Sequence, residues 1–428
     1  MLSQQDLQVE SLGTCAFDTP LRLPAEGVFT DAHRVVYEET FHADAPRSEP
    51  LSFEHAGPRQ RLFFDPSQTT AALVTCGGLC PGLNSVIRAA FLELYYNYGV
   101  PRVLGIRNGY LGLNPSAGLP PIELTPDAVR EIHNLGGTIL QSSRGPQDPS
   151  VMVDFLQEYE IDILFCVGGD GTQRGAQALY EEIARRGLHK AVVGVPKTID
   201  NDIPYVWMTF GYATALEKAQ EALRAAHVEA RGVKNGISIV KLMGRDAGFI
   251  AAGGALASQE ANFVLVPEVE FPLDGDNGFL AALERRVLER AHALVVIAEG
   301  AGQHLFRERD AIQDASGNVK HKDIGPFLRD KVKDHFAGRG VPVVLRYIDP
   351  SYLIRSVPPN AWDRVLASEM ARDAVHAGMA GKTGCLIGFW NNRTVHVPIS
   401  TAVATKKQMD LASPLWTGVL ASTGQPLW

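Results

Sequence analysis

The glycine-rich stretch at residues 167–175 constrains the fold of this chain more than any other segment. It follows a short apolar run at 161–166, typical of a buried strand, and precedes apolar residues at helical spacing. These glycines therefore lie at the carboxyl end of a predicted strand, where open α/β sheets bind their ligands. Glycine there lets backbone N–H groups approach a phosphate, and Asp170 offers the hard oxygen ligand that Mg²⁺ beside a polyphosphate prefers.

By itself this stretch fits equally well a glycine turn whose aspartate caps the next helix, because short glycine motifs recur by chance. The order strand, glycine turn and helix recurs, however, at residues 71–94 and 237–251. In the first of these units, Gly77 and Gly82 have the spacing of a Walker loop, but leucine and asparagine follow instead of Lys-Ser/Thr. A dinucleotide site is also disfavoured, since no acidic residue occurs at 102–107.

A second group of candidate residues follows the predicted strand at 191–196. Asp200 and Asp202 are two positions apart beside Lys197, so in an extended segment both carboxylates point the same way. Two close carboxylates can differ in protonation, and one of them can accept a hydroxyl proton. Taken alone, the cluster fits an Asx-capped turn better. Similarly, Arg144 in the loop at 135–145 is a candidate base-stacking or phosphate residue, although an exposed surface arginine is the commoner case.

Composition limits the function classes. The chain has 428 residues, 45% of them hydrophobic and 21% charged, which is ordinary for a globular protein with room for two domains. The net charge of −8 disfavours nucleic-acid binding, so anionic ligands need local Arg and Lys. Five scattered cysteines without a C-x-x-C pair suit a reducing compartment. Without an apolar leader core or a membrane-length apolar run, the cytoplasm is the expected location and no membrane partner is expected.

Further strands are expected at 263–268, 294–300 and 343–347, and a hairpin of two strands is expected around Asn391 and Asn392. Strands thus alternate with helices across two successive halves. This alternation predicts an α/β fold of two doubly wound, Rossmann-like domains with the active site in the cleft between them. We expect an N-terminal extension at 1–69 with one or two short strands, and domains at 70–210 (with part of 346–390) and 211–345 (with part of 391–428).

Four motifs together resemble the phosphofructokinase family: GGxxPGLN at 77–84, GGDGT at 168–172, PKTIDND at 196–202 and MGRDAG at 243–248. The resemblance covers residues 70–400, and the order of the motifs at successive strand ends makes it specific. The stretch at 347–355 and the N-terminal extension are similar to the longer subgroup found in trypanosomes, plants and some bacteria. The resemblance implies a glycolytic reaction, the transfer of the γ-phosphoryl group of Mg-ATP to the 1-hydroxyl of fructose 6-phosphate.

It also implies roles for individual residues. The first domain would bind ATP through Gly77, Arg144, Gly145, Gly169, Asp170, Gly171 and Thr172, with Asp170 holding Mg²⁺. The second would bind the sugar phosphate, and substrate contacts are implied for Thr198, Ile199, Asp200, Asp202, Met243, Gly244, Arg245, Glu299, Tyr352, Leu353, Ile354 and Arg355. Asp200 would be the base, while Lys197 and Arg245 would stabilise the transferring phosphoryl group.

Gly171 bears on the choice of phosphoryl donor. Pyrophosphate-using members of the family resemble this chain at Lys197 but have aspartate at the position of Gly171, where it would repel a nucleotide phosphate. Glycine therefore favours ATP, with pyrophosphate as the alternative. A NAD or lipid kinase would account only for the 168–172 motif, and a non-catalytic sensor would not need every charged position filled.

The resemblance further implies a homo-oligomer, either a dimer or a tetramer. Short bacterial members carry an arginine seven residues before the methionine of the MGR motif, where it reaches across to another subunit. Here that position is Gly236, and Lys234 is the candidate replacement.

Overall fold

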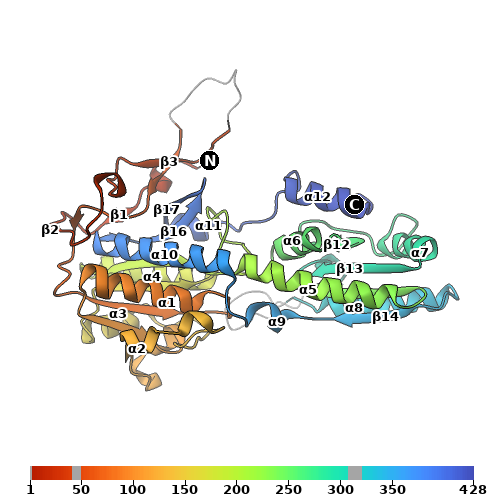
Figure 1. The fold of residues 1–428 in the computed structure, drawn as a ribbon, viewed down its shortest axis with the longest axis horizontal. Coiled ribbons are helices and arrows are strands. Elements are labelled where there is room, and N and C mark those ends of the chain that lie inside the picture. Colours follow the sequence, from red (N-terminus) through yellow and green to blue (C-terminus); the bar gives the residue numbers. More distant parts are fainter. Residues whose placement is uncertain (1, 41–49, 307–320) are drawn as a thin grey trace.

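The computed structural model describes residues 2–40, 50–306 and 321–428. These residues form two lobes that lie side by side along the long axis of the molecule (Figure 1). The first lobe is built on a nine-stranded sheet and the second on a four-stranded sheet, as counted over the described residues. The predicted α/β class with two Rossmann-like units is confirmed.

In the first lobe the central strands are parallel and completely buried, as expected for a sheet covered on both faces. The sheet order is β3-β4-β17-β16-β10-β9-β6-β7-β8. The strands are β3 (Arg34–Val36), β4 (Ser52–His55), β6 (Thr70–Thr75), β7 (Arg102–Ile106), β8 (Ile122–Glu123), β9 (Ile163–Gly168), β10 (Ala191–Pro196), β16 (Cys385–Trp390) and β17 (Arg393–Pro398). Its helices are α1 (Leu83–Leu92), α2 (Pro126–Val129), α3 (Pro149–Glu158), α4 (Asp170–Arg185), α10 (Ala361–Met379) and α11 (Ile399–Ala404).

The second lobe has an all-parallel sheet of order β12-β13-β11-β14, with α5 and α6 packed together on one face. The strands are β11 (Gly236–Leu242), β12 (Phe263–Leu265), β13 (His292–Ala298) and β14 (Val344–Ile348). The helices are α5 (Tyr212–Arg231), α6 (Phe249–Ser258), α7 (Phe279–Arg290), α8 (Ile324–Gly338), α9 (Ser351–Arg355) and α12 (Pro414–Thr423).

The described part of the chain crosses between the lobes three times: before α5, between β14 and α10, and between α11 and α12 (Figure 1). A buried carboxylate ties the first two crossings together. Asp363, at the start of α10 and fully buried, accepts hydrogen bonds from the backbone N–H of Thr214 at 2.7 Å and from the hydroxyl of the same residue. The domain boundaries given above stay a prediction.

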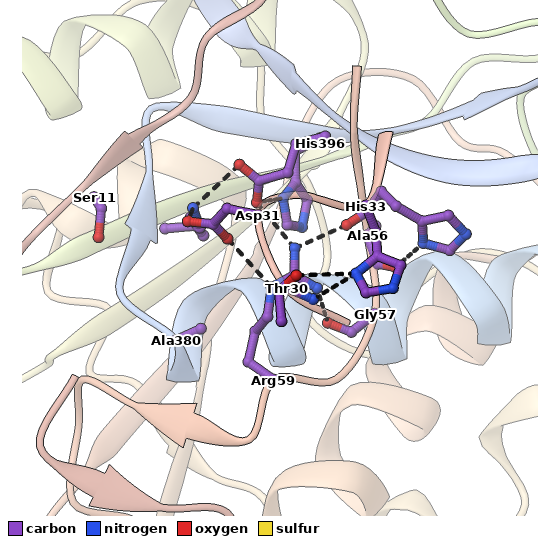
Figure 2. Close-up of polar contacts among 12 residues, drawn as sticks. Ser11, Thr30, Asp31, His33, Ala56, Gly57, Arg59, Ala380 and His396 are labelled. Atoms are coloured by element: carbon purple, nitrogen blue, oxygen red, sulfur yellow. Dashed lines mark hydrogen bonds and ion pairs between the residues drawn. The ribbon is translucent and has the colours of Figure 1, made fainter. Parts of the chain in front are cut away.

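The N-terminal segment contains more strands than the one or two that we expected: β1 (Glu10–Ser11), β2 (Phe17–Asp18), β3, β4 and β5 (Arg61–Leu62). Strands β3 and β4 extend the large sheet beyond β17. A buried ion cluster fixes this junction, and Figure 2 shows Asp31, Arg59 and His396 converging on it. At its centre the Glu54 carboxylate accepts from Arg59 and His396, each at 2.9 Å, and from Lys382 at 3.1 Å.

Candidate active site

A cavity of about 610 Å³ lies between the lobes, within the range of small-molecule sites. Fifteen of the predicted site residues line it: Gly77, Arg144, Gly145, Gly169, Asp170, Gly171, Thr172, Lys197, Thr198, Ile199, Asp200, Asp202, Met243, Arg245 and Arg355. They come from the ends of β6, β9, β10 and β11, from the loop that precedes α3 and from the second crossing. The carboxyl edges of both sheets therefore face one space.

One side of the cavity is formed by the start of α4. The helix begins at Asp170 directly after β9, so its positive end and free N–H groups face the cavity. A side chain at Gly171 would meet no atom within 4 Å, which leaves open space above the backbone. The Asp170 carboxylate accepts from Arg174 at 3.1–3.2 Å, and both residues line the cavity.

Backbone shape also requires glycine at two turns around the cavity. Gly82 precedes α1 with φ of 106°, and a Cβ there would lie 2.7 Å from the Phe210 ring. Gly244 has φ of 124°, and its Cβ would lie 2.6 Å from the carbonyl oxygen of Ala247. Both backbones lie in the left-handed region that favours glycine, so these turns depend on its lack of a side chain.

Lys197 is a buried cation at the end of β10, and only 5% of it is exposed. Its ammonium donates to the carbonyl oxygen of Gly78 at 2.6 Å, across the first glycine turn. Burial lowers the pKa of Lys197, while the thiols of Cys80 and Cys76 and the carboxylate of Asp202 oppose this shift. Lys197 therefore places a positive charge in the cavity wall.

The loop after Lys197 carries the two carboxylates. Burial raises the pKa of Asp200 well above its usual range, and the charges of Asp202 and Glu299 raise it further. The Oδ1 atom of Asp200 is buried without a hydrogen-bond partner among the described residues. Such an unsatisfied oxygen is costly to bury, and it is available to a substrate hydroxyl.

The loop is held by its own side chains. Asn201 has a left-handed backbone with φ of 55°, and its side chain bridges the carbonyl of Trp207 at 3.1 Å and the N–H of Thr209 at 3.1 Å. The Thr209 hydroxyl donates to the carbonyl of Thr198 at 2.7 Å. These contacts close the loop behind the carboxylates and orient them toward the cavity.

Five of the predicted site residues do not line the cavity. Burial raises the pKa of Glu299, while the charges of Lys241 and Arg245 lower it. Gly244, Glu299, Tyr352, Leu353 and Ile354 are absent from the cavity lining among the described residues. Ile354 is fully buried in the core, whereas Tyr352 and Leu353 are each 73% exposed.

Several cavity residues were not predicted. Arg174 and Asp246 line the wall, as do Tyr110 and Met152. Arg174 is four positions after Asp170 on α4, a spacing that places both side chains on one helix face and that the sequence alone could have indicated. Tyr110 and Met152 enter through tertiary packing, without a motif of their own.

Gly236 is the first residue of β11, and a Cβ there would be 2.1 Å from the carbonyl oxygen of Ala230. No side chain fits at this position, so a charged contact from this region has to come from another residue. Lys234, two residues earlier, is exposed.

Comparisons with known proteins agree on one family. The family model described as Phosphofructokinase matches residues 70–378. An ATP-dependent 6-phosphofructokinase of Amycolatopsis methanolica is 48% identical over 99% of this chain and 96% of its own length. The ATP-dependent 6-phosphofructokinase of Trypanosoma brucei brucei is 44% identical over 98% and 87%. ATP-dependent 6-phosphofructokinase 7 of Arabidopsis thaliana is 45% identical over 96% and 84%.

Solved structures show the same fold. The pyrophosphate-dependent phosphofructokinase of Marinobacter aquaeolei superposes with a TM-score of 0.68 at 21% identity, over 83% of this chain and 91% of that one. The phosphofructokinase of Pichia pastoris gives a TM-score of 0.64 at 23% identity, over 83% and 37%. In the described ranges no helix is long and apolar enough to cross a membrane.

Proposed function

The chain belongs to the phosphofructokinase family, and from this premise we propose that it is an ATP-dependent 6-phosphofructokinase. It transfers the γ-phosphoryl group of ATP to the 1-hydroxyl of D-fructose 6-phosphate, giving fructose 1,6-bisphosphate and ADP. One observation carries the proposal: Asp170 and Asp200 line the same cavity, with open space at Gly171 for a triphosphate.

Asp200 is the base of the reaction. Its buried oxygen, unpartnered among the described residues, accepts the proton of the sugar 1-hydroxyl as that oxygen attacks the γ-phosphorus. Thr198 positions Asp200, because its hydroxyl accepts the backbone N–H of Asp200 at 3.0 Å. Lys197 and Arg245 place positive charge where the transferring phosphoryl group gains negative charge, and such electrostatic stabilisation usually contributes most to catalysis of this kind.

Asp170 is the proposed magnesium ligand. It is a carboxylate at a helix start, partly exposed and facing the cavity, which suits a hard cation that also binds phosphate oxygens. When bound, Mg²⁺ supplies charge neutralisation between the phosphates. Arg174, which donates to Asp170 and also lines the cavity, would place positive charge beside the nucleotide phosphates.

We place the sugar phosphate at the second crossing. Arg355 lines the cavity, and a Cβ on Gly78 would lie 3.4 Å from its Nη1 and 3.6 Å from Nη2 of Arg144. Two guanidinium groups beside one glycine turn suit two phosphate-bearing ligands. Glu299 would accept hydrogen bonds from sugar hydroxyls, and Tyr352 supports Arg355 through its ring, 5.1 Å from the guanidinium carbon.

The proposal is tested by measuring turnover of the purified protein with a panel of phosphoryl donors and sugar-phosphate acceptors. ADP release from Mg-ATP should require fructose 6-phosphate and far exceed phosphate release from pyrophosphate with the same sugar. Equal or reversed rates would assign pyrophosphate as the donor, and binding of both substrates without turnover would indicate a sensor. The predicted homo-oligomer and cytoplasmic location stay predictions, to be checked by light scattering and by cell fractionation.

A further inference from the structure

The third crossing contacts loops of the candidate active site. Residues 405–413 lead from α11 on the first lobe to α12 on the second (Figure 1). Four consecutive residues of this segment, 406–409, contact loops of the site. Lys406 pairs with the Asp246 carboxylate at 2.6 Å. The Gln408 amide donates to the Asp246 carbonyl at 3.5 Å, and the backbone N–H of Met409 donates to Glu268 at 2.9 Å.

Lys407 contacts residues of both lobes. Its ammonium donates to the carbonyl oxygens of Val206 at 2.7 Å and Trp207 at 3.1 Å, in the loop that carries the two carboxylates. The same ammonium lies 5.1 Å from the ring centre of Phe249, the first residue of α6 in the second lobe. One half-buried cation therefore touches the loop of the base and the helix that follows Arg245.

These two loops meet at the base itself. The backbone N–H of Arg245 hydrogen-bonds to Asp200 and lowers its pKa, against the larger effect of burial. The distance between Asp200 and Arg245 therefore depends on how the loop at 198–209 sits against the loop at 243–248. Displacement of about 1 Å in such a pair can reduce a rate about 10²-fold.

We propose that Lys407 is a positioning residue, which holds the loop of Asp200 against the loop of Arg245 and keeps both in place for phosphoryl transfer. This role rests on the proposed function. Lys407 is not among the described residues that line the cavity, so it acts through the loops and not on the substrate.

The charge of Lys407 has a second effect on the same loop. Burial lowers the pKa of Lys407 to about 7, and Asp202 raises it. Burial raises the pKa of Asp202, and that of Asp200 with it. The other charged or titratable groups beside these loops are Asp246, His321, Lys406, Asp410, Glu268 and Arg245. Since Lys407 attracts Asp202, neutralising it should raise the pKa of the carboxylates further.

The experiment compares Lys407→Met and Lys407→Arg with Lys190→Met. Lys190 is the matched control, because it also donates to two carbonyls, those of Leu156 at 3.2 Å and Ile161 at 2.5 Å, but lies at the other end of β10. We expect Lys407→Met to reduce kcat at least tenfold, with KM for ATP within about twofold, and to move the acid limb of the kcat–pH profile to higher pH. Lys407→Arg should restore the acid limb, and Lys190→Met should leave kcat and the limb unchanged.

Lys407→Gln, which keeps a donor but removes the charge, replaces Lys407→Met if the latter does not fold. A folded neutral variant with wild-type kcat and acid limb would overturn the proposal. The proposal would also be overturned if the protein folded only with lysine or arginine at position 407, because the residue would then serve folding alone. Absence of sugar-dependent ADP release from the wild type would instead overturn the proposed function.

Discussion

The ammonium of Lys197 lies 2.6 Å from the backbone carbonyl oxygen of Gly78, so a residue after β10 closes over the glycine turn after β6. Lys197 and Gly78 are 119 residues apart in the chain. The contact holds a nearly buried cation where the loop after β10 meets the glycine turn after β6, and it ties these two segments together.

Lys197→Met should remove this cation and reduce kcat about 10²–10³-fold, the usual effect of losing one charge that stabilises a transition state. The measurement is ADP release at saturating substrates. Lys190→Met is the matched control, since it removes a lysine that caps carbonyls at the opposite end of β10. Equal losses in both variants would show that Lys197 acts on the fold and not on the reaction.

Asp200→Asn should reduce kcat about 10²–10⁴-fold, the typical contribution of a positioned general base. Binding of ATP and fructose 6-phosphate, measured by calorimetry, should change little because the amide has nearly the same shape. Asp127→Asn, on the surface of α2, is the control and should keep full activity. Wild-type turnover in the Asp200 variant would remove it as the base.

The same substitution should stabilise the protein at neutral pH. Because burial raises the pKa of Asp200 in the folded state, the folded protein loses stability as pH rises from about 4, the unfolded pKa, to the folded pKa. An asparagine at position 200 does not ionise, so the variant does not lose this stability as the pH rises. We therefore expect the Tm of the variant to exceed that of the wild type at pH 7, with the difference shrinking as pH falls toward 4. A constant difference across pH would contradict the ionisation account.

Gly171→Asp should discriminate against ATP. A Cβ at 171 meets no atom within 4 Å, so the fold accepts a side chain, but the carboxylate repels the nucleotide phosphates. We expect kcat/KM for ATP to fall at least tenfold, or about 1.4 kcal/mol. Gly171→Ala is the control and should retain ATP use. Initial rates with ATP and with pyrophosphate measure the effect, and an unchanged ATP rate would show that residue 171 does not approach the donor.

Local sequence was sufficient to predict much of the architecture. Apolar runs ending near glycine predicted β6, β9 and β11, because a parallel strand covered on both faces is apolar on both sides. The hairpin of β16 and β17 was also predicted from Asn391 and Asn392, whose φ angles of 47° and 56° are those that asparagine tolerates in a tight turn.

The sequence alone placed the carboxylates at 170 and 200 at strand ends, since parallel strands present their carboxyl ends at one edge. Only the tertiary structure decided what surrounds them. The pairing of β4 with β17, the hydrogen bonds of Glu54 to Lys382 and His396, and those of Lys407 to its two carbonyls join residues 200 or more positions apart. No local periodicity encodes such contacts, because they form only when tertiary packing compensates the entropy of closing those long loops.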